Sequence, residues 1–203
     1  MARTLAFDRD EVIRQARAVF WKRGYESASV PELESATGLS RSSIYNSFGS
    51  KRGLFDAAVN SYLDELIRPR LRPLTEPQVA PDALDEYLES IIRSFNQPQS
   101  LPAAHGCLLI NSASAPIARD EQVTRAITAY RAELHAAFSR GLQAANPTLS
   151  ATRHRLLAES ITGLVIAALT LVRISPTEAT ELIRSAQTLS HLNEGPEIPE
   201  ADH

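Results

Sequence analysis

Residues 30–48 constrain the fold of this chain more than any other segment, because they predict two short helices joined by a tight turn. Ser29 and Glu32 have the spacing of a capping box, and Pro31 is tolerated in a first helical turn, where its missing N–H costs nothing. Gly38 follows at the position where a helix commonly ends in a left-handed residue. This arrangement is typical of a helix-turn-helix.

The second helix of this pair is expected to bury one face and to expose a polar one. Ser40 is placed to cap it, and Ile44 and Phe48 lie four residues apart on the inward side. The outward side carries hydroxyl, amide and guanidinium groups, which suit the base edges and phosphate oxygens of DNA. We therefore expect this helix to enter a major groove. Its outward residues are Arg41, Ser42, Ser43, Tyr45 and Asn46.

A further helix is expected before this pair, and another after it. Asp8 and Glu11 have capping-box spacing, and apolar residues then recur at helical intervals as far as Gly24. Ser50 is placed to cap the following helix, which puts Lys51 at an N-terminus where backbone N–H groups favour an anion. The first three helices would form a small domain of their own.

Residues 1–60 resemble the N-terminal domain of the tetracycline-repressor (TetR) family of bacterial transcriptional regulators. The resemblance runs through the segment FDRDEVIRQARAVFWKRGYESASVPELESATGLSRSSIYNSFGSKRGLF. It implies a three-helix DNA-binding head followed by a larger helical body. The residues that carry it are Phe20, Gly24, Tyr25, Ser29, Val30, Leu33, Ala36, Gly38, Leu39, Ser40, Ile44, Tyr45, Phe48, Lys51 and Leu54.

The resemblance also implies roles for individual residues. Tyr45 and Lys51 would hold phosphates, and Ser29 would lie near the DNA backbone. The exposed residues from Arg41 to Asn46 would read sequence. Glu34 departs from the family's pattern, which usually has a small residue there, and is expected to shift the packing of the two helices. The predicted DNA-contacting residues are Ser29, Ser40, Arg41, Ser42, Ser43, Tyr45, Asn46 and Lys51.

The charge distribution gives the predicted head a small basic excess. The whole chain carries a net charge of −3, whereas residues 1–60 hold nine Lys and Arg against seven Asp and Glu. So weak a basic footprint predicts that tight DNA binding needs two heads acting together.

The rest of the chain predicts helices of differing length and no alternating strand pattern, so the expected fold is all-α with about nine helices. A linking helix is expected from about residue 50 to Ile67, ending before Pro69 because a proline disfavours helical backbone in the preceding residue. We expect residues 1–49 to form the DNA-binding domain and residues 50–192 an effector-binding and dimerisation domain. Residues 193–203 are acidic and proline-bearing, and we expect a disordered tail.

The last two predicted helices, from Arg153 to Val172 and from Pro176 onward, are the expected dimer interface. The first is apolar around much of its circumference, so it must be covered on two sides. In the resembling family these helices pair with their copies in a four-helix interface; a self-contained monomeric core is the alternative. The predicted interface residues are Leu157, Ile161, Leu164, Val165, Ala168, Leu182, Ile183, Ala186 and Leu189.

A small organic effector in a helical pocket is the expected regulatory ligand, with no cofactor and no metal. His105 and Cys107 are the sole close pair of metal-ligating side chains, and the other histidines lack ligand spacing. For about half of the predicted lining residues the alternative is that they belong to a packed core, since apolar stripes usually mark a core. The predicted lining residues are Tyr62, Phe95, Cys107, Asn111, Tyr130, Leu134, Phe138 and Leu164.

Cys107 supports two further hypotheses. It stands near the start of a short predicted helix, where a thiolate is favoured, so it could sense electrophiles or oxidants. The alternative is a small buried hydrophobe. A thiol enzyme built on Cys107 and His105 is the competing class, but side chains two residues apart on a helix point in different directions. Catalysis is therefore not expected.

These observations predict a repressor that binds a palindromic operator as a homodimer and leaves it when a small molecule binds. The alternatives within the same class are an activator of transcription and a regulator that binds a protein partner in place of an inducer. A cytoplasmic location is expected, because the chain has a single cysteine and no signal-peptide pattern. Its longest apolar run, from Ile161 to Val172, is also expected to be too short to span a bilayer.

Overall fold

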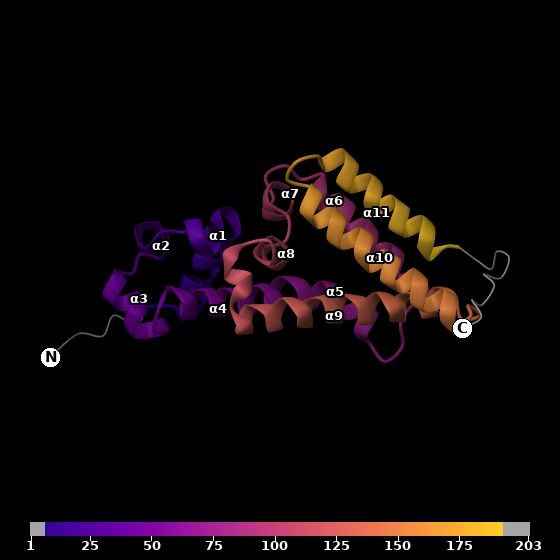
Figure 1. Cartoon of the computed structure of the whole chain (residues 1–203), viewed down its shortest axis with the longest axis horizontal. Coiled ribbons are helices and arrows are strands. Elements are labelled where there is room, and N and C mark those ends of the chain that lie inside the picture. The colour runs from indigo at the N-terminus through magenta and orange to yellow at the C-terminus, as the bar shows by residue number, and fades with distance from the viewer. Residues whose placement is uncertain (1–6, 193–203) are drawn as a thin grey trace. The chain divides into compact units, whose positions relative to one another are not determined.

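The computed structural model describes residues 7–192, and none of these residues lies in a strand (Figure 1). The all-α class predicted from the sequence is therefore confirmed, while the predicted tail of residues 193–203 lies outside the described range. The elements in chain order are α1 (Arg9–Ser27), α2 (Val30–Thr37), α3 (Arg41–Phe48), α4 (Lys51–Tyr62), the π-helical η1 (Leu63–Ile67), α5 (Arg68–Thr75), α6 (Ala83–Phe95), α7 (Leu101–His105), α8 (Leu108–Ala113), the 3₁₀-helical η2 (Pro116–Arg119), α9 (Glu121–Ala145), α10 (Ala151–Leu171) and α11 (Pro176–Ser190).

Packing divides the described residues into two compact units. The first holds residues 7–70 and 98–129, and the second holds residues 71–97 and 130–192. The division falls inside α5 and inside α9, so each of these helices contributes residues to both units. The predicted boundary at residue 49 divides the chain by role rather than by packing, and it stays a prediction.

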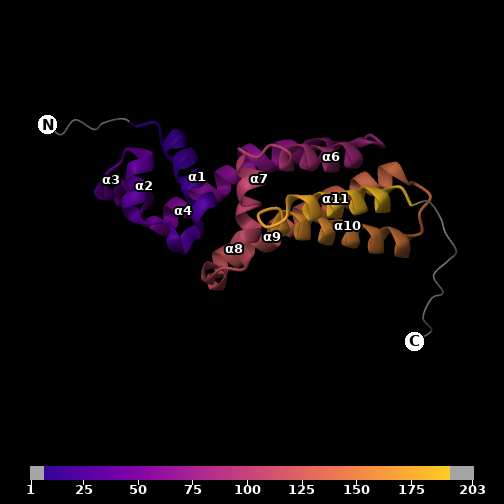
Figure 2. The same cartoon turned by 90° about the horizontal axis from the view of Figure 1, so that it is seen from above.

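The core of the first unit forms where α1 packs against α4 (Figure 2). Phe20 of α1 is fully buried there, with its ring centroid 5.2 Å from that of Phe55 and 6.2 Å from that of Tyr25. Edge-to-face aromatic pairs such as Phe20 with Phe55 add about 0.5–1.5 kcal/mol beyond their buried area. Because α2 packs on α1 and α3 packs on α4, the helix-turn-helix rests on this aromatic core.

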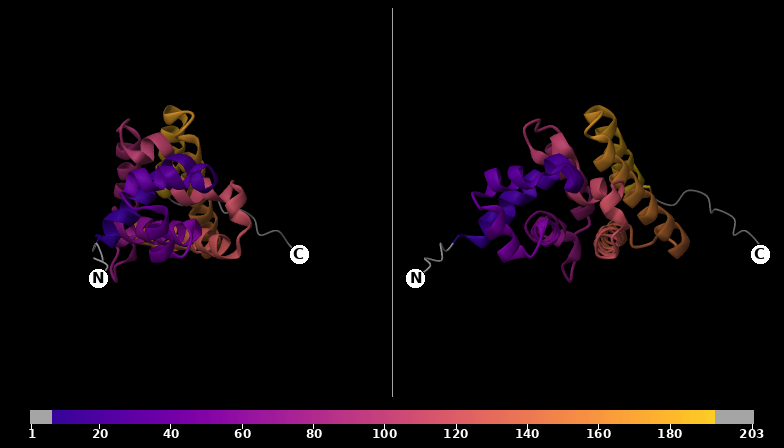
Figure 3. Two further views of the ribbon diagram at one scale, coloured as in Figure 1. Left: turned by 90° about the vertical axis from the view of Figure 1, so that its left-hand side faces the viewer. Right: turned by 60° about the vertical axis from the view of Figure 1, so that its left-hand side comes forward.

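The second unit is built around α10 and α11, which run side by side as the orange and yellow helices of Figure 3. α6 packs on α11. Its core includes Ile161 and Val165 of α10, which are fully buried. Asp85 of α6 accepts a hydrogen bond from the side-chain amide of Gln187 of α11 at 3.1 Å. Among the described residues, α10 alone is long and apolar enough to cross a membrane, and core helices of soluble proteins often satisfy the same criteria.

The expected end of the linking helix before Pro69 is wrong, because the helix continues from α4 through η1 into α5. The π-helical η1 ends at Ile67, two residues before Pro69, whose ring would otherwise meet the carbonyl group four residues earlier. Leu71 and Leu74 of α5 are buried, and Arg140 donates to the carbonyl oxygen of Thr75 at 3.1 Å. Packing thus holds a helix that local propensity opposes.

Candidate nucleic-acid interface

α2 begins and ends where the sequence predicted. The Ser29 N–H donates to Glu32 Oε2 at 3.0 Å and the Glu32 N–H donates to Ser29 Oγ at 3.3 Å, which closes the capping box. The hydrogen bond from the Ser29 N–H is the main cause that lowers the pKa of Glu32 below its ordinary value. Gly38 ends the helix in the left-handed region, at φ 67°. The turn before α3 is thus fixed by local interactions.

α3 exposes a polar face and buries an apolar one. Ser40 caps the helix by accepting the Ser43 N–H at 3.3 Å, and Ile44 is only 1% exposed. Tyr45 is 37% exposed, an unusual position for an aromatic side chain. Of the other residues of α2, α3 and their N-caps that are predicted to contact DNA, Ser43 is half-buried. The exposed ones are Ser29, Ser40, Arg41, Ser42 and Asn46.

Arg41 and Tyr45 lie one helical turn apart on this exposed face. The guanidinium carbon of Arg41 is 5.4 Å from the ring centroid of Tyr45, which is within the range of a cation–π contact. The contact aligns a planar donor with a phenol on one face of α3. Both side chains carry donor groups of the kind that DNA phosphates and guanine edges can accept.

Glu34 connects α2 to the start of α3. Its Oε1 accepts the Arg41 N–H at 2.6 Å, and Arg41 is the first residue of α3. The sequence predicted only that Glu34 would affect the packing of the two helices. The structure shows the contact that it makes: a carboxylate bound to the N-terminus of the exposed helix.

Lys51 is held at the N-terminus of α4, beside the helix-turn-helix. Its Nζ lies 4.5 Å from the ring centroid of Tyr25 and donates to the carbonyl oxygen of Glu26 at 3.5 Å. Partial burial lowers the pKa of Lys51 below its ordinary value, and the carboxylate of Glu26 opposes that shift. A phosphate at this site would favour the charged form of Lys51.

Arg9 is a candidate DNA-contacting residue that the sequence reasoning missed. Its Nη1 donates to the carbonyl oxygen of Ser47 at 3.1 Å, and its guanidinium carbon lies 4.3 Å from the ring centroid of Phe48. Arg9 thus sits at the C-terminal end of α3, although it belongs to α1. No local pattern signals this contact, because 38 positions separate Arg9 from Ser47.

Gly53 lets α4 approach the end of α3 closely. A Cβ atom added at Gly53 would lie 2.0 Å from the carbonyl oxygen of Phe48, far closer than any real contact. Since the obstacle is backbone, no side-chain rotation could relieve it. Glycine at this position therefore sets how closely α3 and α4 pack.

A loop between α7 and α8 is tied to both α1 and α4. The Trp21 indole N–H donates to the carbonyl oxygen of Gly106 at 2.9 Å, and the Tyr62 hydroxyl donates to Cys107 Sγ at 3.3 Å. Gly106 has φ 66°, a left-handed backbone that favours glycine. Cys107 is 1% exposed. This buried loop is thus in contact with the helix that carries the helix-turn-helix core.

η2 is attached to the same part of the first unit by polar contacts. Arg52 donates to Asp120 Oδ1 at 2.8 Å and to Asp56 Oδ1 at 2.8 Å, and the Ile117 N–H donates to Glu26 Oε1 at 2.7 Å. The hydrogen bond from Arg52 holds the pKa of Asp120 well below its ordinary value, and Asp120 raises the pKa of Arg52 in return.

The eight predicted pocket residues are divided between the two units. Tyr62 and Cys107 contact each other in the first unit, where Asn111 donates to the carbonyl oxygen of His105 at 2.6 Å. The other five lie in the second unit. Four of them are buried, namely Phe95, Tyr130, Leu134 and Phe138, and Leu164 is half-buried.

A cavity of about 40 Å³ in the first unit has a different lining. It lies between α4, α8 and the start of α9, and none of the eight predicted residues lines it. Sequence periodicity could not find it, because its walls come from three separate helices. Its lining residues are Asp56, Val59, Asn60, Leu109, Gln122, Val123 and Ala126.

Most of the predicted interface residues pack within the second unit. Six of them are buried, namely Leu157, Ile161, Val165, Ala168, Ile183 and Ala186, and Leu164, Leu182 and Leu189 are half-buried. The face of α10 that remains exposed carries Leu156, Gly163, Ala167 and Ile174 just beyond its end. As for metals, residues 7–192 contain no group of three His, Cys, Asp or Glu side chains able to hold an ion.

Comparison with known proteins gives consistent matches. A family model described as bacterial regulatory proteins, tetR family, matches residues 12–58. The protein named uncharacterized HTH-type transcriptional regulator YezE of Bacillus subtilis (strain 168) is 32% identical over 142 residues, which are 70% of this chain and 72% of that protein. The HTH-type transcriptional repressor ComR of Escherichia coli (strain K12) is 34% identical over 111 residues, 54% of this chain and 51% of that protein.

Solved structures extend the likeness to most of the chain. The TetR family transcriptional regulator CifR, a cysteine mutant complexed with 26bp double-strand operator DNA, is 28% identical. It matches with a TM-score of 0.75 over 92% of this chain and 98% of that one. The similarity therefore includes the helices that follow the helix-turn-helix.

Proposed function

The chain belongs to the tetR family of bacterial regulatory proteins and is a transcriptional regulator, and we propose that it acts as a homodimeric repressor that a ligand releases from a palindromic operator. The observation that carries this proposal is the exposed polar face of α3, with Arg41 and Tyr45 in contact on it. Two comparisons support the proposal. One relative is named a transcriptional repressor, and another similar protein was solved in complex with operator DNA.

We assign two kinds of DNA contact to the predicted residues. Arg41, Ser42 and Asn46 would reach base edges from α3, since they occupy its outward face. Tyr45 and Lys51 would hold phosphates, which position the protein without reading sequence. Arg9 would add a third cation beside the end of α3.

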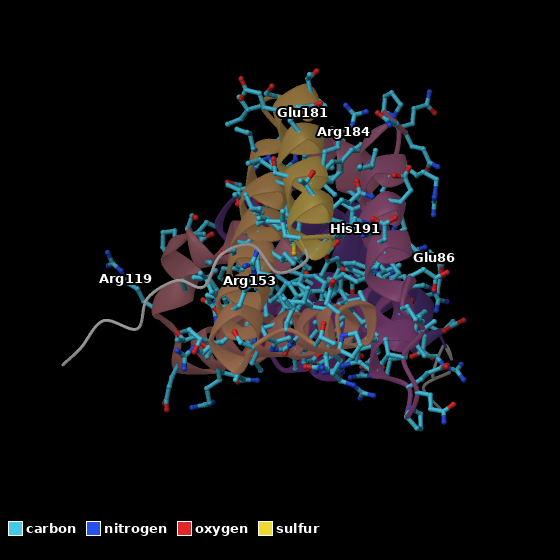
Figure 4. All side chains as sticks on the ribbon, turned by 90° about the vertical axis from the view of Figure 1, so that its right-hand side faces the viewer. Glu86, Arg119, Arg153, Glu181, Arg184 and His191 are labelled. Carbon is cyan, nitrogen blue, oxygen red and sulfur yellow. The ribbon has the colours of Figure 1, made fainter. Side chains whose placement is uncertain are left out.

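The exposed face of α10 supports a homodimer. Leu156 is 51% exposed and Ile174 is 82% exposed, which is costly for aliphatic side chains left in water. Between them, Gly163 has open space where a Cβ would stand, so a partner helix could approach closely. Figure 4 shows the side chains of Glu181 and Arg184 on α11 and of His191 just after it, which would form a polar rim.

To bind beside α4, an organic effector of drug size would have to enlarge the cavity there. The cavity beside α4 measures about 40 Å³, whereas drug-sized pockets typically measure about 300–1,000 Å³. Its walls combine the polar Asp56 and Gln122 with apolar side chains, which suits a small amphipathic molecule. A ligand that binds only the opened form would shift the protein toward it, and DNA affinity would change with that population.

A thiol-based response through Cys107 is the second candidate. The Tyr62 hydroxyl donates to Cys107 Sγ at 3.3 Å, so a chemical change at this sulfur would disturb a contact with α4. An adduct on Sγ could not fit in this buried position without moving the loop, and Trp21 of α1 is bonded to the adjacent Gly106. A thiol enzyme lacks comparable support, and we keep the expectation that the chain is a cytoplasmic regulator without catalytic activity.

A salt-dependent DNA-binding titration tests the proposal. The probe is the duplex from the gene's own upstream region, compared with random duplex, and the variants are Tyr45→Ala and Lys51→Ala. We expect preferential binding that both variants weaken, with a salt slope shallower by about one for Lys51→Ala. Arg93→Ala, which removes an exposed cation of α6, is the matched control. Equal binding of both duplexes by the wild type would refute the proposed function.

A further inference from the structure

The N-terminus of α3 is already occupied by an anion that belongs to the chain. Glu34 is half-buried, and its Oε1 binds the Arg41 N–H at 2.6 Å. Ser40 Oγ accepts the Ser43 N–H at 3.3 Å, so a second backbone donor of the first turn is also used. A helix N-terminus ordinarily attracts phosphate through such free N–H groups and the positive end of its dipole.

This occupancy changes how α3 can meet DNA. A phosphate that approached the Arg41 N–H would have to displace the Glu34 carboxylate, and the two negative charges would repel each other. Two N–H groups in the first turn of α3, those of Arg41 and Ser43, are therefore closed to the sequence-independent contact that helix N-termini usually offer. DNA binding must therefore depend on the outward side chains of α3. Arg41 is one of them, and Glu34 fixes its backbone by accepting its N–H.

We propose that Glu34 is a positioning residue that raises the sequence specificity of DNA binding. It has two separable effects: its hydrogen bond fixes the first turn of α3 against α2, and its charge weakens attraction to DNA of any sequence. This inference rests on the proposed DNA-binding function. It predicts that specific and non-specific affinities respond differently when the bond and the charge are removed one at a time.

Two substitutions separate these effects. Glu34→Gln keeps an oxygen that can accept the Arg41 N–H but removes the charge, whereas Glu34→Ala removes both. The probes are a duplex that the wild-type protein enriches from a random-sequence library and a duplex of scrambled sequence. Both are titrated at fixed salt, and circular dichroism verifies that each variant is folded. Glu86→Gln, which removes an exposed carboxylate of α6, is the matched control.

Glu34→Gln is expected to raise affinity for the scrambled duplex by roughly fivefold, with a smaller gain for the enriched duplex, so that the specificity ratio falls. Glu34→Ala is expected to raise affinity for the scrambled duplex and to lower it for the enriched one. Equal changes on both duplexes, or none, would overturn the inference while leaving the DNA-binding function intact. If the wild type enriches no duplex, the proposed function fails and the inference fails with it.

Discussion

Trp21 donates its indole N–H to the carbonyl oxygen of Gly106 at 2.9 Å, although 85 positions separate the two residues. The bond is buried, and the Trp21 ring also packs edge-to-face on Tyr62, with 4.9 Å between centroids. Through this pair, α1 is joined to the loop that carries Cys107. The helix that supports the DNA-binding head is therefore in direct contact with that loop.

Replacing Trp21 with Phe should lower the free energy of unfolding by about 1–3 kcal/mol, because the Gly106 carbonyl would be left buried without this donor. Urea unfolding followed by circular dichroism measures the change. Tyr62→Phe is the comparison variant: it keeps the ring but removes the hydroxyl, and a smaller loss is expected because sulfur is a weak acceptor. An unfolding free energy unchanged by Trp21→Phe would show that the bond contributes nothing to stability.

Asp120→Asn should remove a contribution to stability that depends on pH. Since Arg52 depresses the folded-state pKa of Asp120, the ion pair stabilises the protein above the unfolded-state value, about 3.9, and is lost as pH falls through the lower folded-state value. The midpoint of thermal unfolding should differ between wild type and variant from pH 5 to pH 8, and the gap should narrow below about pH 4.

Asp120 Oδ1 accepts hydrogen bonds from the N–H groups of Gln122 and Val123 at 2.8 and 3.2 Å. The amide introduced by Asp120→Asn would still offer an oxygen to both N–H groups. The start of α9 should therefore survive the substitution. A gap between the two melting midpoints that stays constant down to pH 3 would contradict the assignment to the Arg52 ion pair.

Ser29→Ala should destabilise the protein by about 0.5–2 kcal/mol, because α2 would lose its N-cap. Ser35→Ala, an exposed position in the same helix, is the control and should have little effect. Thermal unfolding of the two variants gives the comparison. If Ser29→Ala weakens operator binding with an unchanged melting midpoint, Ser29 acts as a DNA contact and not as a cap.

Gly53→Ala should prevent the close packing of α3 on α4, since its Cβ would lie 2.0 Å from the Phe48 carbonyl oxygen. We expect a loss of more than about 2 kcal/mol in unfolding free energy, typical of overpacked sites. The Cβ added by Gly163→Ala would meet open space, and alanine favours a helix more than glycine does. The unfolding free energy of the monomer should therefore stay the same or rise slightly. Equal stability of the two variants would mean that α3 can shift away from α4 at no cost.

Leu156→Glu should convert a dimer to monomers if α10 provides the interface, because a charge would be placed within a buried apolar surface. Sedimentation velocity over a range of protein concentrations measures the oligomeric state. Tyr45→Glu introduces the same charge at an exposed aromatic residue of α3 and should leave that state unchanged. A Leu156→Glu protein that sediments like the wild type would place the interface elsewhere.

Local signals allowed the sequence to predict the helix-turn-helix closely. Ser29, Gly38 and Ser40 fix helix ends through contacts within four residues, so their roles follow from spacing alone. Pro69 misled the same reasoning, because buried leucines and a π turn outweigh the preference of a proline. The preference of proline acts only on neighbouring residues, whereas the packing that outweighed it involves residues far apart in the sequence.

The contacts that join the head to later segments could not be predicted. Arg52 meets Asp120 across 68 positions, a separation over which no local pattern signals a contact. Apolar residues at helical spacing do not distinguish a packed core from the lining of a pocket. The predicted residues Tyr130, Leu134 and Phe138 are all buried, and the cavity beside α4 has other walls.

The bond between Trp21 and Gly106 also gives the protein a built-in optical reporter. Trp21 is the sole tryptophan of the chain, so all indole emission originates at the contact between α1 and the Cys107 loop. A compound or oxidant that displaces the Gly106 carbonyl would change the polarity around that one indole. Unlabelled protein could therefore be screened for effectors by the wavelength of its emission, before any operator is known.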